Sequence, residues 1–161
     1  MRTAVLPGSF DPITVGHLDL AARAAALFDR VILCVMINGE KRSLFTMEQR
    51  LEMARAALAG SPNARAEAWD GLLADFARER GAAALVKGAR GEADFGWELQ
   101  LAQINRDLNP DLDTILLPAR PEHLHISSTM VREMIRCHQK LDAYVPTGAA
   151  EVLRGFLKGK V

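Results

Sequence analysis

The stretch that decides the fold is residues 3–37, which read TAVLPGSFDPITVGHLDLAARAAALFDRVILCVMI. Residues 3–6 are mostly apolar and stop at a Pro-Gly pair, which indicates a short buried strand followed by a tight turn. Residues 16–28 place Leu, Ala and Phe at helical spacing, and residues 31–37 form a β-branched apolar run of strand length. A strand, a helix and a second strand in this order predict a right-handed crossover between parallel strands.

The same alternation continues through the chain. Thr46 and Gln49 form a capping-box pattern, which predicts the start of a helix at residue 46. We expect further strands at 64–69, 82–86 and 114–117, and helices at 46–58, 72–80, 93–108, 128–138 and 149–157. Ser127 or Ser128 caps the helix that ends near residue 138. The order predicts one α/β domain over residues 1–161, with a Rossmann-like, doubly wound, mainly parallel sheet and helices on both faces.

Charge and composition exclude several classes of partner. The chain has 20 Lys and Arg against 20 Asp and Glu, so its formal net charge is zero. A neutral chain has no overall field to attract nucleic acid or an anionic membrane, so neither is expected as a partner. No apolar run approaches the roughly 18 residues that a membrane span needs. Cys34 and Cys137 make neither a disulfide framework nor a zinc pattern, which is typical of a cytoplasmic protein.

If a neutral chain binds phosphate, it must do so with a few placed cations and backbone amides. The loop after the first strand supplies such groups. Gly8 permits a tight turn, Ser9 offers a hydroxyl and an amide, and Gly16 permits close approach at a helix start. His17 then lies in the first helical turn, where free amides and the helix dipole favour an anion. A lone glycine or histidine is ordinarily structural, but the joint pattern points to a phosphate site.

Three segments resemble a known family. The segments 8–12 (GSFDP) and 14–17 (TVGH), with 127–132 (SSTMVR), resemble the signatures of the nucleotidyltransferase superfamily. Residues 87–106 (KGARGEADFGWELQLAQINR) narrow this resemblance to the bacterial phosphopantetheine adenylyltransferases. The resemblance implies an enzyme of coenzyme A biosynthesis that transfers the adenylyl group of ATP to 4′-phosphopantetheine. It also implies dephospho-coenzyme A and pyrophosphate as products, Mg²⁺ accompanying ATP, and a homohexamer.

The resemblance also implies roles for individual residues. His17 would stabilise the transition state, with Lys41 and Arg90 as further catalytic groups. The implied ATP contacts are Ser9, Phe10, His17, Gly88, Ala89, Arg90, Glu98, His123, Leu124, His125, Ile126, Ser127, Ser128 and Thr129. The implied phosphopantetheine contacts are Ser9, Lys41, Leu73 and Lys87. No carboxylate cluster forms a metal site, so we expect the triphosphate and water to hold Mg²⁺.

Three positions depart from the family pattern. Lys87 stands where many members carry Arg, which keeps the charge but loses the bidentate geometry. Gly71 removes a side chain near Leu73, which leaves acceptor contacts there open. His123 either stacks on the adenine base or is simply exposed, and the sequence does not decide between these.

The expected mechanism is attack in line by the acceptor phosphate on the α-phosphorus of ATP. A phosphate is already an anionic nucleophile, so catalysis requires positioning and charge stabilisation and no general base. The alternatives are a nicotinamide- or nicotinate-mononucleotide adenylyltransferase, a glycerol-phosphate cytidylyltransferase, a non-catalytic nucleotide-binding regulator or a flavodoxin-like binding module. The segment 87–106 argues against the related transferases, and the intact 14–17 and 127–132 motifs argue against the regulator. A flavodoxin-like module has no reason to carry His17.

Overall fold

A computed structural model describes residues 1–37 and 43–158 of the chain. Within these residues the strands form one parallel sheet of order β3-β2-β1-β4-β5. The strands are β1 (Thr3–Gly8), β2 (Arg30–Met36), β3 (Ala64–Trp69), β4 (Ala82–Ala89) and β5 (Asp113–Pro118). The chain builds outward from β1 to β3, then returns to add β4 on the other side of β1. The predicted parallel α/β sheet is confirmed, and its switch point lies between β1 and β4.

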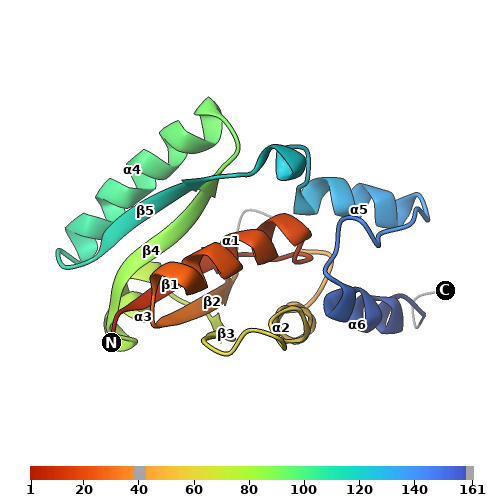
Figure 1. The fold of residues 1–161 in the computed structure, drawn as a ribbon, viewed down its shortest axis with the longest axis horizontal. Helices are drawn as coiled ribbons and strands as arrows, with labels where there is room; N and C mark the ends of the chain where they lie inside the picture. Colours follow the sequence, from red (N-terminus) through yellow and green to blue (C-terminus); the bar gives the residue numbers. More distant parts are fainter. Residues whose placement is uncertain (38–42, 159–161) are drawn as a thin grey trace.

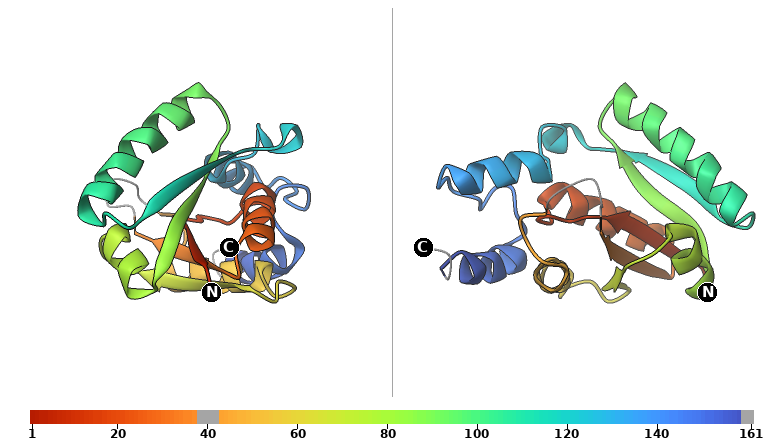
Figure 2. Two further views of the ribbon diagram at one scale, coloured as in Figure 1. Left: turned by 60° about the vertical axis from the view of Figure 1, so that its left-hand side comes forward. Right: turned by 180° about the vertical axis from the view of Figure 1, so that it is seen from behind.

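Helices cover both faces of this sheet (Figures 1 and 2). One face carries α1 (Val15–Leu27), α2 (Met47–Ala57), α5 (Ser128–Arg136) and α6 (Thr147–Lys158). The other face carries α3 (Leu73–Glu79) and α4 (Glu92–Leu108), and a short 3-10 turn, η1 (Pro121–His123), precedes α5. The larger core cluster packs α1, α2, α5 and α6 on the sheet, and the smaller one packs α3. The doubly wound arrangement is therefore confirmed.

Side-chain caps fix where three helices begin. Thr46 and Gln49 form the predicted capping box at α2. Ser127 accepts a hydrogen bond from the N–H of Met130, which decides between the two serines as the cap of α5. At α1, Thr14 and His17 form a capping box that the sequence pattern did not reveal, because histidine replaces the usual Glu or Gln.

The predicted end of β4 at residue 86 is wrong. β4 continues to Ala89 because β5 pairs with it as far as Ala89 and Pro118. In contrast, β1 pairs with β4 only as far as Val5 and Leu85. The two central strands separate beyond that point, and Figure 1 shows β4 and β5 leaning away from β1. This divergence opens a crevice at the carboxyl ends of the strands.

The two cysteines are in different environments. Cys34 is buried in β2, where burial raises the pKa of its thiol to about 12, and Cys137 is exposed. Both thiols are free.

In residues 1–37 and 43–158, no helix has the length and hydropathy to cross a membrane.

Candidate active site

A cavity of about 310 Å³ occupies the crevice between β1 and β4. Its walls come from β1, α1, β4 and α4, together with the segment 119–132. Eleven of the predicted site residues line it: Ser9, His17, Lys87, Gly88, Arg90, Glu98, His123, Ile126, Ser127, Ser128 and Thr129. The fold thus brings together residues that lie more than 100 positions apart in the sequence.

His17 occupies the first turn of α1 with its ring held in place. The backbone N–H of Thr14 donates to His17 Nδ1 at 3.0 Å, and Thr14 Oγ1 lies at the same distance from that nitrogen. The ring packs edge-on against Phe10, with centroids 5.0 Å apart. Burial, and secondly the charge of Arg90, lower the pKa of His17 from 6.5 to about 4. The imidazole is therefore neutral near pH 7.

Two cations of β4 and its following turn are paired with carboxylates of α4. Lys87 Nζ lies 3.0 Å from Glu98 Oε1, and both side chains are largely buried. Arg90 Nε donates to Asp94 Oδ2 at 2.9 Å, and this hydrogen bond holds the pKa of Asp94 below its usual range. Asp94 and Glu98 are four residues apart, so the same face of α4 presents both carboxylates. The two predicted phosphate-binding cations thus have an internal anion each.

A third carboxylate, that of Asp19, lines the cavity from α1. Asp19 lies 3.0 Å from Arg120 Nε and 3.5 Å from an amino nitrogen of Arg23, and Arg23 also donates to the carbonyl of Pro118. Sequence reasoning singled out none of these residues, since each is an ordinary charged residue in its own helix or loop. The lining includes five Lys or Arg side chains and three carboxylates. The cavity is therefore mixed in charge, with its cations balanced locally by carboxylates.

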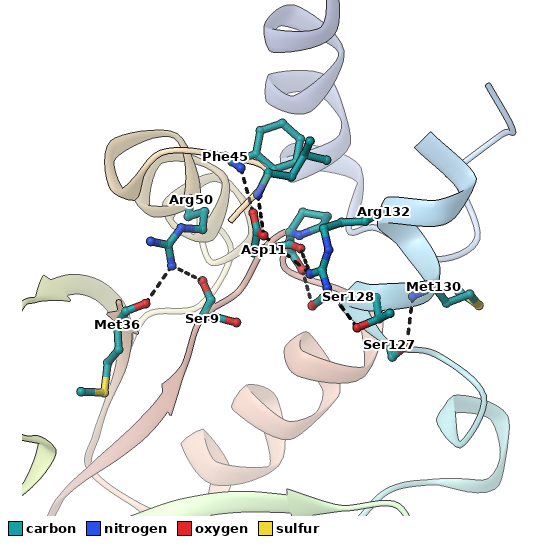
Figure 3. A network of polar contacts seen from close by, with 12 residues as sticks. Ser9, Asp11, Met36, Phe45, Arg50, Ser127, Ser128, Met130 and Arg132 are labelled. Atoms are coloured by element: carbon teal, nitrogen blue, oxygen red, sulfur yellow. Dashed lines mark hydrogen bonds and ion pairs between the residues drawn. The ribbon is translucent and has the colours of Figure 1, made fainter. Parts of the chain in front are cut away.

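A polar network ties the 8–14 loop to α2 and α5 (Figure 3). Asp11 is buried and accepts the backbone N–H groups of Leu44 at 2.8 Å and Phe45 at 3.0 Å. Arg132 donates to the backbone carbonyl of Asp11 at 2.7 Å and to Thr129 Oγ1 at 3.0 Å. Ser128 Oγ donates to the carbonyl of Pro12 at 2.8 Å. Arg132 and Ser128 of one sequence motif therefore hold the loop of the other motif, and Asp11 ties that loop to the segment before α2.

Gly8 and Gly88 lie where an added side chain would be crowded. A Cβ at Gly8 would lie 2.9 Å from the ring of Phe10, and one at Gly88 would lie 3.2 Å from Leu20. Phe10 itself has a φ of 45°, a left-handed conformation that is costly for an aromatic residue. Close packing thus holds the loop in a strained conformation beside the cavity.

Five of the other six predicted site residues are not among those that line the cavity. Phe10 is buried behind His17, and Leu73 packs on the α3 face with the smaller core cluster. Ala89, Leu124 and His125 do not appear in the lining of this cavity. Lys41 lies outside the described residues. The roles assigned to these six residues stay predictions.

His123 lines the cavity and is only partly exposed, so it is not a simply exposed side chain, and its stacking on adenine stays a prediction. Its Cβ lies 3.7 Å from where a side chain of Gly16 would begin. Its Nδ1 is buried and has no hydrogen-bond partner among the described residues. The imidazole thus keeps an unused polar atom at the wall of the cavity.

The described part of the chain has no cluster of metal-ligating side chains. Residues 1–37 and 43–158 contain no group of three or more His, Cys, Asp or Glu side chains that could hold a metal ion. The Mg²⁺ expected to arrive with ATP stays a prediction.

Comparison with known proteins identifies the family. A model of the cytidylyltransferase-like family matches residues 5–134. The chain is 44% identical over 153 residues to the phosphopantetheine adenylyltransferase of Psychromonas ingrahamii, covering 95% of each protein. It is 46% identical over 154 residues to the enzyme of the same name from Symbiobacterium thermophilum, covering 96% of this chain and 95% of that one.

A solved structure supports the fold. A structure from Vibrio parahaemolyticus, named for nicotinate-nucleotide adenylyltransferase, superimposes with a TM-score of 0.69 at 16% identity. The match covers 96% of this chain and 93% of the other, and at this identity it speaks for the fold alone. Because the family model covers most of the chain and the named relatives match nearly all of it, the chain belongs to the phosphopantetheine adenylyltransferases of the cytidylyltransferase-like family.

Proposed function

We propose that this chain transfers the adenylyl group of ATP to 4′-phosphopantetheine, forming dephospho-coenzyme A and pyrophosphate. The observation that carries the proposal is the cavity between β1 and β4, where His17, Lys87 and Arg90 line one space. Family membership supports the identity of the two substrates, because the relatives at 44% and 46% identity are named phosphopantetheine adenylyltransferase.

In the proposed reaction an oxygen of the acceptor phosphate attacks the α-phosphorus of ATP. A new phosphorus–oxygen bond forms, the bond from the α-phosphorus to the bridging oxygen breaks, and pyrophosphate leaves. The nucleophile is anionic before it binds, so no residue has to remove a proton. The chain contributes positioning and compensation of negative charge.

His17 is the proposed donor to the α-phosphate. Because Nδ1 accepts the N–H of Thr14, the proton of the neutral ring resides on Nε2, which is free to donate. A neutral donor stabilises the charge that develops on the phosphate without needing protonation beforehand.

The cations of the cavity are the proposed phosphate ligands. Lys87 would bind the acceptor phosphate and Arg90 the triphosphate of ATP, with Lys41 as a further acceptor contact. The free amides at the start of α5, near Ser128 and Thr129, would hold oxygens of the triphosphate. Mg²⁺ would enter as part of the ATP complex, bound by phosphate oxygens and water.

We extend the proposal to a homohexamer in the cytoplasm. The cytoplasmic location rests on the family resemblance. The assembly has additional support from α4, none of whose residues is buried in the single chain. This helix exposes Phe95, Trp97, Leu99, Ile104 and Leu108, each by 45% or more. Apolar surface of this extent commonly marks a contact between proteins.

A substrate matrix tests the proposed activity. Pyrophosphate release is measured with ATP or CTP in combination with 4′-phosphopantetheine, nicotinamide mononucleotide, nicotinate mononucleotide or glycerol phosphate. We expect release only with ATP and 4′-phosphopantetheine, and dephosphorylated pantetheine is the matched control that lacks the nucleophile. Release with CTP and glycerol phosphate, or with ATP and a mononucleotide, would assign the chain to one of the related transferases.

A further inference from the structure

Arg50 is a buried arginine that the mechanism has not used. It belongs to α2, and only 3% of its surface is exposed. One of its terminal nitrogens donates to two backbone carbonyls, of Ser9 at 2.6 Å and of Met36 at 2.8 Å. The other terminal nitrogen lies 4.0 Å from Met47 Sδ. Figure 3 shows the guanidinium reaching from α2 to both carbonyls.

These two carbonyls lie where the β1–β2 ladder ends. The ladder pairs Gly8 with Val35, and Ser9 and Met36 follow these residues directly. Arg50 therefore joins the ends of β1 and β2 one residue beyond their last pair. Ser9 lines the cavity, so the clamp acts on a residue of the candidate site.

Burying the charged guanidinium of Arg50 costs folding free energy. Its Nε is buried with no hydrogen-bond partner among the described residues. No carboxylate lies within ion-pair distance of it in residues 1–37 and 43–158, although Asp11 and Glu48 act on it through their charges. Burial lowers the pKa of Arg50, which reflects the cost of keeping this cation out of water. An apolar side chain of similar volume avoids this cost but leaves the Ser9 and Met36 carbonyls without this donor, so the constraint that favours arginine is its hold on these carbonyls.

The constraint lies in the peptide that Arg50 holds. The peptide between Ser9 and Phe10 is planar and trans, so directing the Ser9 carbonyl to α2 directs the Phe10 N–H the opposite way. Among the described residues, that N–H has no hydrogen-bond partner. A cation on the carbonyl also polarises the peptide and strengthens the N–H as a donor. Phe10 is strained at a φ of 45°, so the loop needs an external hold to keep this orientation.

We propose that Arg50 is a positioning residue for adenylyl transfer, which orients and polarises the Ser9–Phe10 peptide so that its N–H donates to a phosphate oxygen of the bound nucleotide. This inference rests on the proposed function, since it names the nucleotide phosphate as the ligand of that N–H. Arg50 touches neither substrate and acts through the peptide.

The test compares Arg50→Lys and Arg50→Met with the wild-type chain. Arg50→Lys keeps the charge but has no fork to hold two carbonyls, and Arg50→Met keeps an extended side chain without donors. We expect kcat to fall at least about 10-fold in both, with the KM for phosphopantetheine changed less than about threefold, because a transition-state donor is misplaced. In the chain labelled with ¹⁵N-phenylalanine, MgATP shifts the Phe10 amide resonance of the wild type, and the shift is reduced in both variants.

Arg55→Met is the matched control, because Arg55 lies on the same helix and is exposed. It should leave kcat and the Phe10 resonance unchanged. A folded Arg50→Lys with wild-type kcat and a wild-type Phe10 shift would overturn the proposal, and so would failure of both Arg50 variants to fold. If the wild-type chain shows no adenylyl transfer, the proposed function fails, while the MgATP-dependent shift still decides whether Arg50 controls this peptide.

Discussion

The backbone N–H of Thr14 donates to Nδ1 of His17 at 3.0 Å, and this bond determines the tautomer of the histidine. Nδ1 is occupied as an acceptor, so the neutral ring carries its proton on Nε2. The same capping box that begins α1 thus prepares a neutral donor at the cavity wall.

Replacing His17 by alanine should lower kcat by about 10²–10³-fold, because one transition-state donor is lost. Steady-state pyrophosphate release measures the loss. His138→Asn is the matched control, since His138 is exposed and lies outside the cavity. A folded His17→Ala variant within threefold of wild-type kcat would remove His17 from the mechanism.

The lowered pKa of His17, about 4, predicts how stability depends on pH. Between pH 6.5 and 4 the unfolded chain binds a proton at this position that the folded chain does not. The free energy of unfolding therefore falls as the pH drops through this window. Urea unfolding at pH 7.5, 5.5 and 4.5 should show a smaller fall for His17→Asn than for the wild type. An equal fall in both proteins would contradict the lowered pKa.

Replacing Glu98 by glutamine should free Lys87, from which Glu98 lies 3.0 Å away. The acceptor phosphate then no longer competes with an internal carboxylate, so its Kd should tighten about 3- to 10-fold, up to roughly 1.4 kcal/mol. The Kd for ATP should weaken, because Glu98 is a predicted ATP contact. Isothermal titration calorimetry measures both constants. Glu92→Gln, at an exposed position of the same helix, serves as the control. Weaker binding of the acceptor by Glu98→Gln would contradict the competition.

Replacing Asp11 by asparagine should destabilise the fold by about 2–4 kcal/mol. The carboxylate accepts two backbone N–H groups, and an amide can present a donor to one of them. Denaturant unfolding measures the change, with Asp111→Asn as a surface control. Equal midpoints for the two variants would mean that this network adds nothing to stability.

Replacing Trp97 or Ile104 by glutamate should break the proposed assembly, because a charge on the exposed apolar face of α4 is costly to bury. Light scattering at several protein concentrations should give a smaller mass for these variants than for the wild type. Gln100→Glu adds the same charge at an exposed position of α4 and tests whether charge alone is responsible. A wild-type mass in all three variants would direct the search to another face.

Local patterns predicted the elements well and their ends less well. Strand and helix positions follow from periodicity and caps, as at Thr46 and Ser127, since these signals lie within one element. The end of β4 depends instead on how far β5 runs beside it, and no residue near Val86 reveals that distance. Pairing across a sheet is a long-range property, which explains this error.

The same difference between local signals and long-range packing decides which residues of the candidate site could be predicted. Motif residues such as His17 and Arg90 were found because their spacing matches a family pattern. The ion pairs of the cavity were not, since Lys87 and Glu98 meet only once β4 and α4 pack together. Arg50 looked like one of many charged residues on an amphipathic helix, and only its burial and its two carbonyl contacts distinguish it.

The hydrogen bond from Ser128 to Pro12 spans 116 positions of the chain, and that from Arg132 to Asp11 spans 121. The wall of the cavity is therefore among the last parts to form as the chain leaves the ribosome. A nascent chain that lacks α5 has its β1 loop but not the groups that close it. A bound nucleotide can stabilise only the chain whose cavity has formed, because a ligand stabilises the state that binds it.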